Sequence, residues 1–389
     1  MSNPHSIQLQ TGELQISVLS ARFPLETLLT FGSRLNPKRR FLFVSKVLGK
    51  YVPCLPSAMR ETYVALASNI QPFVQRSAHI WVLGVAETAT GLGAGVAREI
   101  KRNSGASQSG QQIIYSHTTR SALVREIDFS IEEAHSHAPG HLIYHLQNIL
   151  SVSQVSSAVI VDDEISTGKT LAQLTENLIR KLPNLKTVVW TSLVNWMSEQ
   201  ERSAFARQFP HIKLVFCTLL DGTFEFNADP NFKDELPELT ATGISQALSR
   251  ADLGRTGYSM QSEMAGVFKN TQRRSVLAHL DKNTPYTVIG TGEFSFQPFL
   301  LAEQMQQQGF NVLFQSSGRS PAIKDCGINS KLSGFDEAHK GMFYLYNLAE
   351  NRQPLLCYEN IEQYQSCPFK ALITAEIAVL DTFSANECL

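Results

Sequence analysis

Two adjacent acids followed by a short polar run are the residues in this sequence best suited to chemistry. Asp162 and Asp163 follow the apolar residues 158–161, and a helical pattern begins at Leu171. The polar run contains Ser166, Thr167, Gly168, Lys169 and Thr170. We therefore expect the acids at the carboxyl end of a buried strand and the polar run at a helix amino terminus. Such a helix start suits a phosphate, and the acids suit sugar hydroxyls or a metal-bound water. The pattern predicts a ribose 5-phosphate site.

A P-loop is a rival interpretation, because residues 167–170 read Thr-Gly-Lys-Thr. That motif requires a glycine five residues before Gly168, and the residue there is Asp163. An ordinary strand-loop-helix turn is a second rival, but it gives no reason for two acids at the end of a buried strand. The ribose 5-phosphate site is the interpretation that accounts for both features.

A second loop of small residues follows the apolar strand predicted at 80–85 and opens another helix. It contains Glu87, Thr88, Ala89, Thr90 and Gly91. Small residues and hydroxyls between a strand and a helix start allow a phosphate to approach closely. Close packing of a helix on a strand would explain this loop equally well, but the polar run at 166–170 makes a second phosphate loop the stronger hypothesis.

Several ionisable residues lie elsewhere in the first half of the chain. Arg120 follows the strand predicted at 111–117, where it could clamp two oxygens of a polyphosphate. The stretch 132–145 contains Glu133, His135 and His137, together with two further histidines. Zinc is disfavoured there because the histidines crowd around a Pro-Gly pair and lack a standard ligand spacing. Closure of this stretch over a substrate would exclude water.

Length and composition indicate an ordinary globular chain with two domains. The chain has 389 residues, of which 43% are hydrophobic, and its 34 basic and 35 acidic residues almost cancel. This balance gives no general argument for nucleic acid or membrane partners, and no long apolar run is present. Six scattered cysteines without a C-x-x-C pair indicate reduced thiols, so we expect a cytoplasmic protein.

Strands and helices alternate along both halves of the chain, which predicts an α/β fold with parallel sheets. A turn-rich stretch at 227–237 suggests domains at 1–235 and 236–389. In the second domain, two polar loops follow neighbouring strands and could bind a ligand; they include Gly290, Thr291, Gly292, Glu293, Arg319 and Ser320. A purely structural layer is the alternative there, since the full G-x-G-x-x-G fingerprint is absent.

The segment 158–170 resembles the phosphoribosyl pyrophosphate (PRPP) signature of type I phosphoribosyltransferases, in which an apolar strand and two acids precede a phosphate loop. The resemblance implies that Asp162 and Asp163 hold the ribose hydroxyls, and that residues 166–170 hold the 5-phosphate. It implies that residues 87–91 form the pyrophosphate loop and that 132–145 is the closing loop, with Glu133, His135 and His137 as catalytic candidates. Purine-using relatives carry an acid at the position of Ser166, which puts purine chemistry in doubt.

The stretch around 41–50 resembles the amino-terminal strand of orotate phosphoribosyltransferases, which implies a substrate-facing role for Lys46 or Lys50, although a solvated cationic face remains the alternative. The second half is similar to the TRSP domain, whose motif appears here as Gly-Arg-Ser-Pro at 318–321. That domain follows phosphoribosyltransferase domains in bacterial gene clusters linked to tellurium resistance and stress. Together the two resemblances imply a parallel-sheet type I phosphoribosyltransferase fold with a second, Rossmann-like α/β domain.

We therefore expect an enzyme that transfers ribose 5-phosphate from PRPP to a small, nucleobase-like acceptor and releases pyrophosphate. Mg²⁺ is the expected cofactor, with Asp162 and Asp163 as its ligands, and Lys46 and Arg120 as further catalytic residues. A homodimer is expected by resemblance. The alternative is a PRPP-sensing or nucleotide-sensing regulator without catalysis. A nucleic-acid binder that uses residues 34–50 is a third possibility, which the neutral overall charge disfavours.

Overall fold

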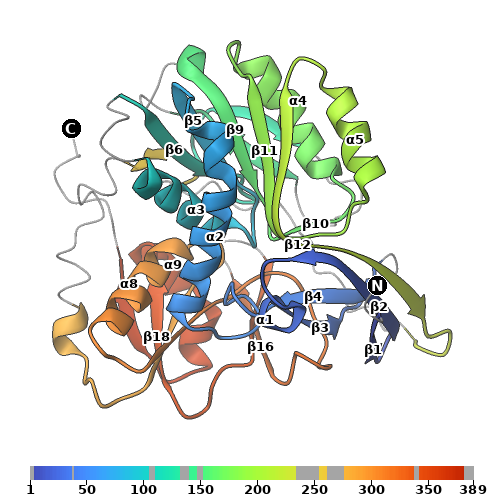
Figure 1. Cartoon of the computed structure of the whole chain (residues 1–389). Helices are drawn as coiled ribbons and strands as arrows, with labels where there is room; N and C mark the ends of the chain where they lie inside the picture. The colour runs from blue at the N-terminus through green and yellow to red at the C-terminus, as the bar shows by residue number, and fades with distance from the viewer. Residues whose placement is uncertain are drawn as a thin grey trace.

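The computed structural model describes residues 4–36, 39–104, 110–131, 140–146, 152–233, 254–260, 276–336 and 341–380. Most of these residues form two lobes, which Figure 1 shows one above the other. The first lobe spans residues 4–233 and the second lobe spans residues 276–380. Each lobe combines a mostly or wholly parallel sheet with helices, so the predicted α/β class is confirmed for both.

The first lobe contains the following elements. Its strands are β1 (His5–Leu9), β2 (Gly12–Ala21), β3 (Leu29–Ser33), β4 (Phe41–Ser45), β5 (His79–Gly84), β6 (Gln112–His117), β7 (Ile127–Ile131), β8 (His141–Tyr144), β9 (Val155–Val161), β10 (Glu164–Ile165), β11 (Thr187–Asn195) and β12 (Lys213–Ala228). Its helices are α1 (Leu25–Leu28), α2 (Pro56–Val74), α3 (Thr90–Asn103), η1 (Val152–Gln154), α4 (Lys169–Lys181) and α5 (Glu199–Gln208).

The remaining elements follow in the last third of the chain. The short strand β13 (Tyr258–Ser259) lies between the lobes in sequence. The second lobe consists of β14 (Tyr286–Gly290), α8 (Phe296–Gln307), β15 (Val312–Ser316), β16 (Lys331–Asp336), β17 (Gly341–Tyr346), β18 (Gln353–Tyr358), α9 (Ile361–Ser366), η2 (Pro368–Ala371) and β19 (Glu376–Val379).

The large sheet of the first lobe has nine strands within the described residues, in the order β1-β2-β12-β11-β9-β5-β6-β13, with β10 beside β11. Strands β12, β11, β9, β5 and β6 run parallel, whereas β1, β2 and β13 pair antiparallel at the two edges. In chain order the five parallel strands stand as 2-1-3-4-5. The strand order reverses between β5 and β9, and open α/β sheets bind ligands at such a point, outside the carboxyl ends of the strands.

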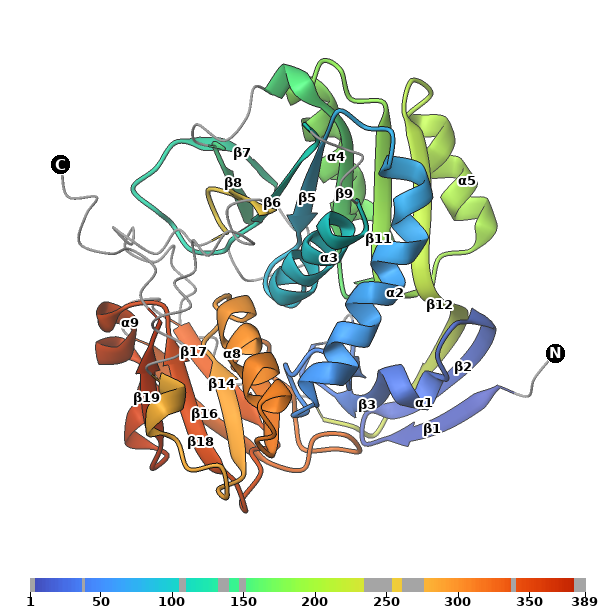
Figure 2. The same ribbon diagram turned by 60° about the vertical axis from the view of Figure 1, so that its left-hand side comes forward.

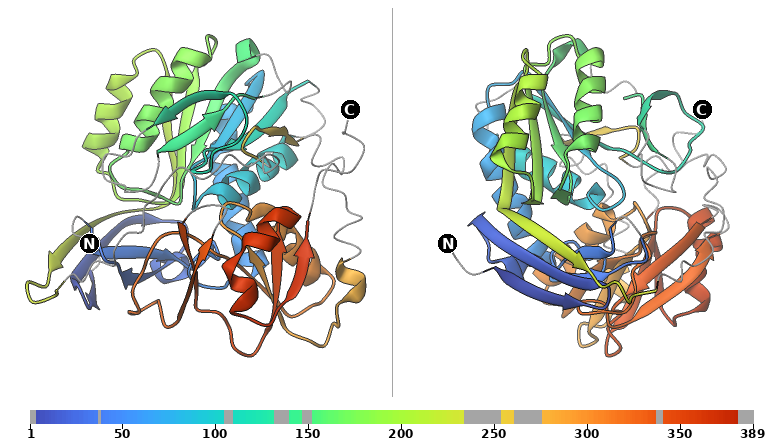
Figure 3. Two further views of the ribbon diagram at one scale, coloured as in Figure 1. Left: turned by 180° about the vertical axis from the view of Figure 1, so that it is seen from behind. Right: turned by 90° about the vertical axis from the view of Figure 1, so that its right-hand side faces the viewer.

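Helices cover both faces of the large sheet, as Figures 1 and 3 show. Ile80 and Val82 of β5 belong to the buried cluster that includes α2 and α3. Trp81 and Leu83 alternate to the other face and pack in the cluster that includes α4. This double burial explains why β5 and β9 are continuous apolar runs rather than alternating ones. Two covered faces leave the sheet's carboxyl edge as the place where polar loops can gather.

The strands and helices expected from the sequence pattern are largely confirmed. The strand expected at 80–85 is β5, and the helical pattern expected to begin at Leu171 lies in α4. The pairing of β12 with β2 was not anticipated, and it carries β12 on to Ala228, inside the stretch expected to be a turn. The register of this pairing shifts between Asp221 and Gly222, and a Cβ atom on Gly222 would lie 2.8 Å from the Ser17 carbonyl oxygen and 2.9 Å from the Trp196 ring.

The domain boundary expected at residue 235 lies outside the described residues and stays a prediction. Residues 254–260, which follow it, contribute β13 to the edge of the large sheet, where Tyr258 pairs with Tyr115 and Ser259 with Ile114. The segment after the expected boundary is thus attached to the first lobe before the chain enters the second.

The small sheet of the second lobe has the order β15-β14-β18-β19, and its strands are parallel throughout. In chain order they stand as 2-1-3-4, so the strand order reverses between β14 and β18. The antiparallel pair β16–β17 forms a separate hairpin, and Tyr344 of this hairpin bridges to Gly318 after β15. This lobe therefore has its own ligand-binding position of the kind that the large sheet has between β5 and β9.

The lobes share one hydrophobic core. Helix α8 packs against α2 and α3, and Figure 2 shows α2 running from the large sheet down to the second lobe. Tyr63 and Phe299 meet edge to face, with ring centroids 5.2 Å apart, and belong to one buried cluster. Arg98 binds Glu303 through two hydrogen bonds of 2.7 and 3.0 Å across the same contact. No helix within the described part of the chain is long and apolar enough to cross a membrane.

The buried Arg98–Glu303 pair should be critical for stability. Arg98→Met leaves the Glu303 carboxylate buried without its bidentate partner, which typically costs about 3–5 kcal/mol. We expect a loss of this order in the free energy of unfolding, measured by urea titration. The control is Arg202→Met, which removes a half-exposed pair with Asp221 and should cost less than about 1 kcal/mol. Equal losses in the two variants would show that the contact between the lobes contributes little.

Candidate active site

The loops after β5 and β9 lie side by side where the strand order of the large sheet reverses. The amide of Val85 donates to the Val161 carbonyl oxygen (2.8 Å), and the Asp162 amide donates to that of Thr191 (2.9 Å). These bonds extend the strand ladder to the start of both loops. The ladder therefore places the predicted pyrophosphate loop beside the predicted ribose site.

Asp162 and Asp163 are both half-buried at the end of β9. The Asp163 amide donates to Oδ1 of Asp162 (2.9 Å), which holds the Asp162 carboxylate against the backbone of the loop. Burial raises the pKa of Asp162, and the neighbouring carboxylate of Asp163 raises it further. Burial and the charge of Glu164 raise the pKa of Asp163 to about 6. The pair is therefore under-compensated in charge, and an arriving cation or hydroxyl donor would stabilise its ionised form.

Glu164, the third consecutive acid, has a cation of its own. Its carboxylate lies 2.5 Å from Nη1 of Arg39, whose guanidinium also lies 5.0 Å from the centre of the Phe41 ring. Burial disfavours the charged form of Arg39, but Glu164 and Asp163 outweigh it, so the pKa of Arg39 is raised. This pair was not predicted from the sequence. The run of cations before the β4 strand was the available signal.

Residues 166–170 lead from the acids into α4. Gly168 is the N-cap with φ +67°, and as a glycine it has no side chain to occupy the first amides of the helix. A Cβ atom there would lie 3.0 Å from the Phe205 ring and 3.1 Å from the Trp190 ring. Thr167 and Lys169 are exposed, and Ser166 and Thr170 are half-buried. The expected phosphate loop is thus an accessible helix start that requires glycine at its tightest point.

Residues 87–91 form the turn from β5 into α3, and the Ala86–Glu87 peptide bond is cis. The Ala86 amide donates to Oγ1 of Thr118 (2.9 Å), and the Thr90 and Ser295 hydroxyls are 2.9 Å apart. A Cβ atom on Gly91 would also lie 2.9 Å from the Ser295 hydroxyl oxygen. Thr90, Ala89 and Gly91 are buried, whereas Glu87 and Thr88 are half-buried. The second lobe therefore covers one end of the predicted pyrophosphate loop.

Glu87 links this loop to the second lobe. Its Oε2 accepts a hydrogen bond from the backbone amide of Arg319 (3.2 Å). Its Oε1 is buried and has no hydrogen-bond partner among the described residues. An unpaired buried carboxylate oxygen is costly, so this atom is a candidate contact for a ligand or metal-bound water.

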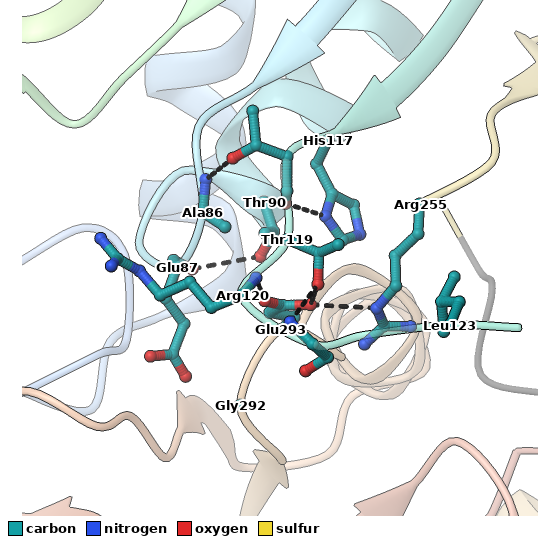
Figure 4. A network of polar contacts seen from close by, with 12 residues as sticks. Ala86, Glu87, Thr90, His117, Thr119, Arg120, Leu123, Arg255, Gly292 and Glu293 are labelled. Atoms are coloured by element: carbon teal, nitrogen blue, oxygen red, sulfur yellow. Dashed lines mark hydrogen bonds and ion pairs between the residues drawn. The ribbon is translucent and has the colours of Figure 1, made fainter. Parts of the chain in front are cut away.

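Arg120 lies at the end of β6, as predicted, but its backbone amide has a role that the sequence did not reveal. This amide and the Thr119 hydroxyl donate to the Glu293 carboxylate, at 2.9 and 2.6 Å. The Arg120 side chain contacts Nε2 of His141 (3.4 Å), and His141 also contacts the Thr118 hydroxyl (2.8 Å). Figure 4 shows Glu293 at the centre of this network.

Arg255 completes the binding of Glu293. Its Nε donates to Glu293 (3.0 Å), and its Nη1 donates to both Glu359 oxygens (3.0 and 3.1 Å). Burial alone would raise the pKa of Glu293, but Arg255 and the other surrounding cations outweigh it and lower that pKa. Arg255 was not predicted to be a site residue. Its two partners are 38 and 104 residues away, a distance that no local pattern reveals.

The two candidate lysines have different surroundings. Lys46 is exposed, and its Nζ donates to the Glu26 carbonyl oxygen (2.7 Å). Lys50 is buried, and its Nζ donates to the carbonyl oxygens of Gly292 (2.7 Å) and Ser317 (3.2 Å). Burial lowers the pKa of Lys50, although Glu87 and Glu293 oppose this shift. Lys50 therefore joins the two loops of the second lobe to the first lobe.

The closing loop was expected to supply Glu133, His135 and His137, and these three residues lie outside the described residues. Of the neighbouring histidines, His145 pairs with Asp128 (3.0 Å). The described ranges contain no group of three or more His, Cys, Asp or Glu residues that could hold a metal ion. Asp162 and Asp163 alone remain the predicted metal ligands.

The predicted ligand loops of the second lobe come together at the small sheet. Thr291, Gly292, Glu293 and Arg319 line a common cavity. Gly290 and Ser320 do not line it: the Gly290 carbonyl oxygen accepts from the Ser317 amide (3.0 Å), and that of Ser320 accepts from the Tyr346 hydroxyl (2.8 Å). Phe343 and Gln363 also line the cavity and were not predicted, because they approach it from β17 and α9.

Two family models match successive parts of the chain. A family model described as phosphoribosyl transferase matches residues 28–223. A second model, described as the TRSP domain carboxyl-terminal to that transferase domain, matches residues 252–374. No curated protein matches the chain.

Solved structures with similar folds include two adenine phosphoribosyltransferases and one orotate phosphoribosyltransferase. The adenine enzyme of Trypanosoma brucei, solved with AMP, pyrophosphate and ribose-5-phosphate, is 15% identical, with a TM-score of 0.36 over 52% of this chain and 82% of its own. That of Rhodothermus marinus is 20% identical, with a TM-score of 0.33 over 50% and 97%. The orotate enzyme of Aeropyrum pernix is 17% identical, with a TM-score of 0.29 over 50% and 88%.

The raised pKa of Asp163 predicts a pH-dependent stability. A carboxyl group whose pKa is higher in the folded state favours folding when protonated, and this contribution is lost as the pH rises from about 4 through about 6. Asp163→Asn removes the charge, so it should be more stable than wild type at pH 7.5, by about 1 kcal/mol or more. The gain should shrink toward pH 4. Urea unfolding at a series of pH values measures this difference.

The control for the pH series is Glu350→Gln, which changes an exposed acid in a distant loop. Its difference from wild type should stay within about 0.5 kcal/mol at every pH. A destabilised Asp163→Asn variant at pH 7.5 would contradict the unfavourable burial of this carboxylate.

Proposed function

We propose, from the premise that the chain belongs to the phosphoribosyl transferase family and carries a TRSP domain, that it transfers ribose 5-phosphate from PRPP to a small, nucleobase-like acceptor. The observation that carries this proposal is the pair Asp162 and Asp163 directly before the accessible start of α4, where the strand order of the large sheet reverses. The acids would accept hydrogen bonds from the ribose hydroxyls, and residues 166–170 would hold the 5-phosphate.

Pyrophosphate would lie on the neighbouring loop. Residues 87–91 start α3 beside the ribose site, and the Arg120 side chain stands at the end of the next strand. In the reaction, the bond from C1 of the ribose to pyrophosphate breaks and a bond from the acceptor to C1 forms. Cationic and amide donors around the leaving group would stabilise its charge. Lys46, Glu133, His135 and His137 remain proposed catalytic residues, the last three on the predicted closing loop.

The acidic residues of the site fit Mg²⁺. This ion is usually held by one or two carboxylates together with substrate phosphates, rather than by a protein cage. Asp162 and Asp163 supply such carboxylates, and their under-compensated charge would favour a cation. When bound, Mg²⁺ would neutralise charge on the leaving pyrophosphate.

The setting of the reaction is also part of the proposal. The product is proposed to be a nucleoside-like compound made under stress. The support is the TRSP domain, because the domain it resembles occurs in gene clusters linked to tellurium resistance and stress. The cysteines in the described residues, Cys54, Cys217, Cys326, Cys357 and Cys367, are free thiols, which supports the cytoplasm. A homodimer is proposed by analogy with type I enzymes.

A regulator that senses PRPP without catalysis is the second candidate. It would use the same ribose and phosphate contacts but release no pyrophosphate. The stretch 132–145 has dense ionisable residues and was predicted to close over the substrate. This prediction favours the enzyme, because closure over a substrate serves chemistry more than binding.

Calorimetric titration of PRPP with Mg²⁺ tests the proposal. Wild type should bind PRPP, and Asp162→Asn/Asp163→Asn should bind at least about 100-fold more weakly, because it loses charge-assisted hydrogen bonds to the sugar. The Glu350→Gln variant should bind like wild type. Absence of binding by the folded wild type would overturn the transferase proposal.

Pyrophosphate release separates the two candidates. A mixture of PRPP, Mg²⁺ and a panel of nucleobases should release pyrophosphate with wild type, and Arg120→Ala should reduce the rate at least about 10-fold through lost charge stabilisation. PRPP binding without release, for every base in the panel, would support the regulator instead.

A further inference from the structure

Glu87 gives the loop at 87–91 a negative charge, although this loop is proposed to bind pyrophosphate, which is itself strongly negative. Like charges at one site repel each other, and the repulsion is strongest where water is largely excluded. Glu87 is half-buried, and its Oε1 is buried without a hydrogen-bond partner among the described residues. The carboxylate must therefore be compensated by a nearby cation before an anion can bind to this loop.

Arg319, from the loop after β15, contacts this carboxylate and the neighbouring loop of the first lobe at the same time. Its backbone amide donates to Oε2 of Glu87 (3.2 Å), and its Nη2 donates to the Ser121 hydroxyl (3.2 Å). Ser121 is buried directly after Arg120, in the loop that follows β6. One residue of the second lobe thus connects the two loops that would hold pyrophosphate.

The guanidinium of Arg319 is held in place without using all of its donors. It lies over the Phe343 ring, 5.4 Å from the ring centre. Its Nε is buried and lacks a hydrogen-bond partner in the part of the chain that the structure describes. An unused buried donor on a cation costs free energy in the empty protein. A role toward an anion explains this cost better than a purely structural contact between the lobes.

Lys50 is a second cation that interacts with Glu87, but it is a weaker source of compensation. Its Nζ donates to the carbonyl oxygens of Gly292 (2.7 Å) and Ser317 (3.2 Å). Burial lowers the pKa of Lys50, and the positive charge of Arg319 lowers it further, although Glu87 opposes this shift. An arginine, by contrast, stays charged under all ordinary conditions. The lasting positive charge beside Glu87 is therefore that of Arg319.

We propose that Arg319 is a positioning residue of the transferase site: its charge compensates Glu87, and its bond to Ser121 holds the loop that carries Arg120. The second lobe thereby completes the part of the site that binds pyrophosphate. The inference rests on the proposed function, because it concerns the anion that the transferase would release. The proposed contacts to ribose 5-phosphate at 162–170 do not involve Arg319, so the two halves of PRPP should respond differently to its loss.

Separate calorimetric titrations of the full chain with ribose 5-phosphate and with inorganic pyrophosphate, both with Mg²⁺, test the proposal. Arg319→Gln should weaken pyrophosphate binding about 10-fold or more, because the compensating charge is lost, and should leave ribose 5-phosphate binding within about twofold of wild type. Arg319→Lys keeps the charge and should retain pyrophosphate binding within about threefold. The matched control is Arg352→Gln, which removes a guanidinium at the opposite end of the small sheet, where it binds Asn311 (2.7 Å), and should leave both affinities unchanged.

A second substitution separates compensation of charge from a merely structural contact. Glu87→Gln keeps an oxygen that can accept from the Arg319 amide, but it removes the negative charge. Combined with Arg319→Gln, it should restore pyrophosphate binding to within about threefold of wild type, because no carboxylate is left to compensate. A contact that only ties the lobes together would not be restored in this way.

The possible outcomes distinguish this inference from the proposed function. Equal weakening of both ligands in Arg319→Gln, no weakening of either, or no recovery in the double variant overturns the inference alone. If Arg319→Gln does not fold, Glu87→Gln decides: it should tighten pyrophosphate binding about threefold by removing the repulsion, and unchanged or weaker binding overturns the inference. Wild type that binds neither ligand overturns the transferase proposal, and this inference with it.

Discussion

The position of the two lobes relative to each other depends on the hydrogen bonds of the Glu293 carboxylate. Glu293 follows β14 in the second lobe. Its carboxylate accepts hydrogen bonds after the end of β6 in the first lobe, from the Thr119 hydroxyl and the Arg120 amide. Arg255, from the segment that joins the lobes, neutralises it. A buried carboxylate is tolerated only with such partners, because its desolvation must be offset. The contact therefore fixes the carboxyl edges of the two sheets against each other.

This arrangement determines which loops meet. Glu87 follows β5 in the large sheet and binds the amide of Arg319, which follows β15 in the small one. Thr90, on the same loop as Glu87, contacts the Ser295 hydroxyl after β14. Each sheet places polar loops at the point where its strand order reverses, and here these points adjoin. Shared hydrogen bonds therefore hold the polar loops of the two sheets together.

The sequence predicted local structure well and long-range pairing poorly, for a physical reason. Buried parallel strands such as β5 and β9 are continuous apolar runs, and the residues that follow them carry the polar loops, so both can be recognised locally. A substrate-facing role was predicted for Lys46 or Lys50, and it stays a prediction. The observed partners of Lys50, the carbonyl oxygens of Gly292 and Ser317, are 242 and 267 residues away. Backbone carbonyls have no sequence signature. The Arg39–Glu164 pair and the antiparallel addition of β2 to β12 escaped prediction because they too form only when distant segments fold together.

The charges around the acids explain why a ligand would be held at this point of the chain. The positive charge of Arg39 lowers the pKa of Asp163. The Arg39 guanidinium is bound to Glu164, however, so it compensates the charge of Asp163 only in part. Lys50 is turned toward the second lobe by two carbonyl oxygens. Asp162 and Asp163 consequently share a half-buried position with raised pKa values, because neighbouring carboxylates of the acidic run add to the effect of burial. The ionised form of such a pair is unfavourable in the empty protein, and hydroxyl donors or a cation would stabilise it. Binding of a substrate would therefore offset the free energy that burial of the two acids costs.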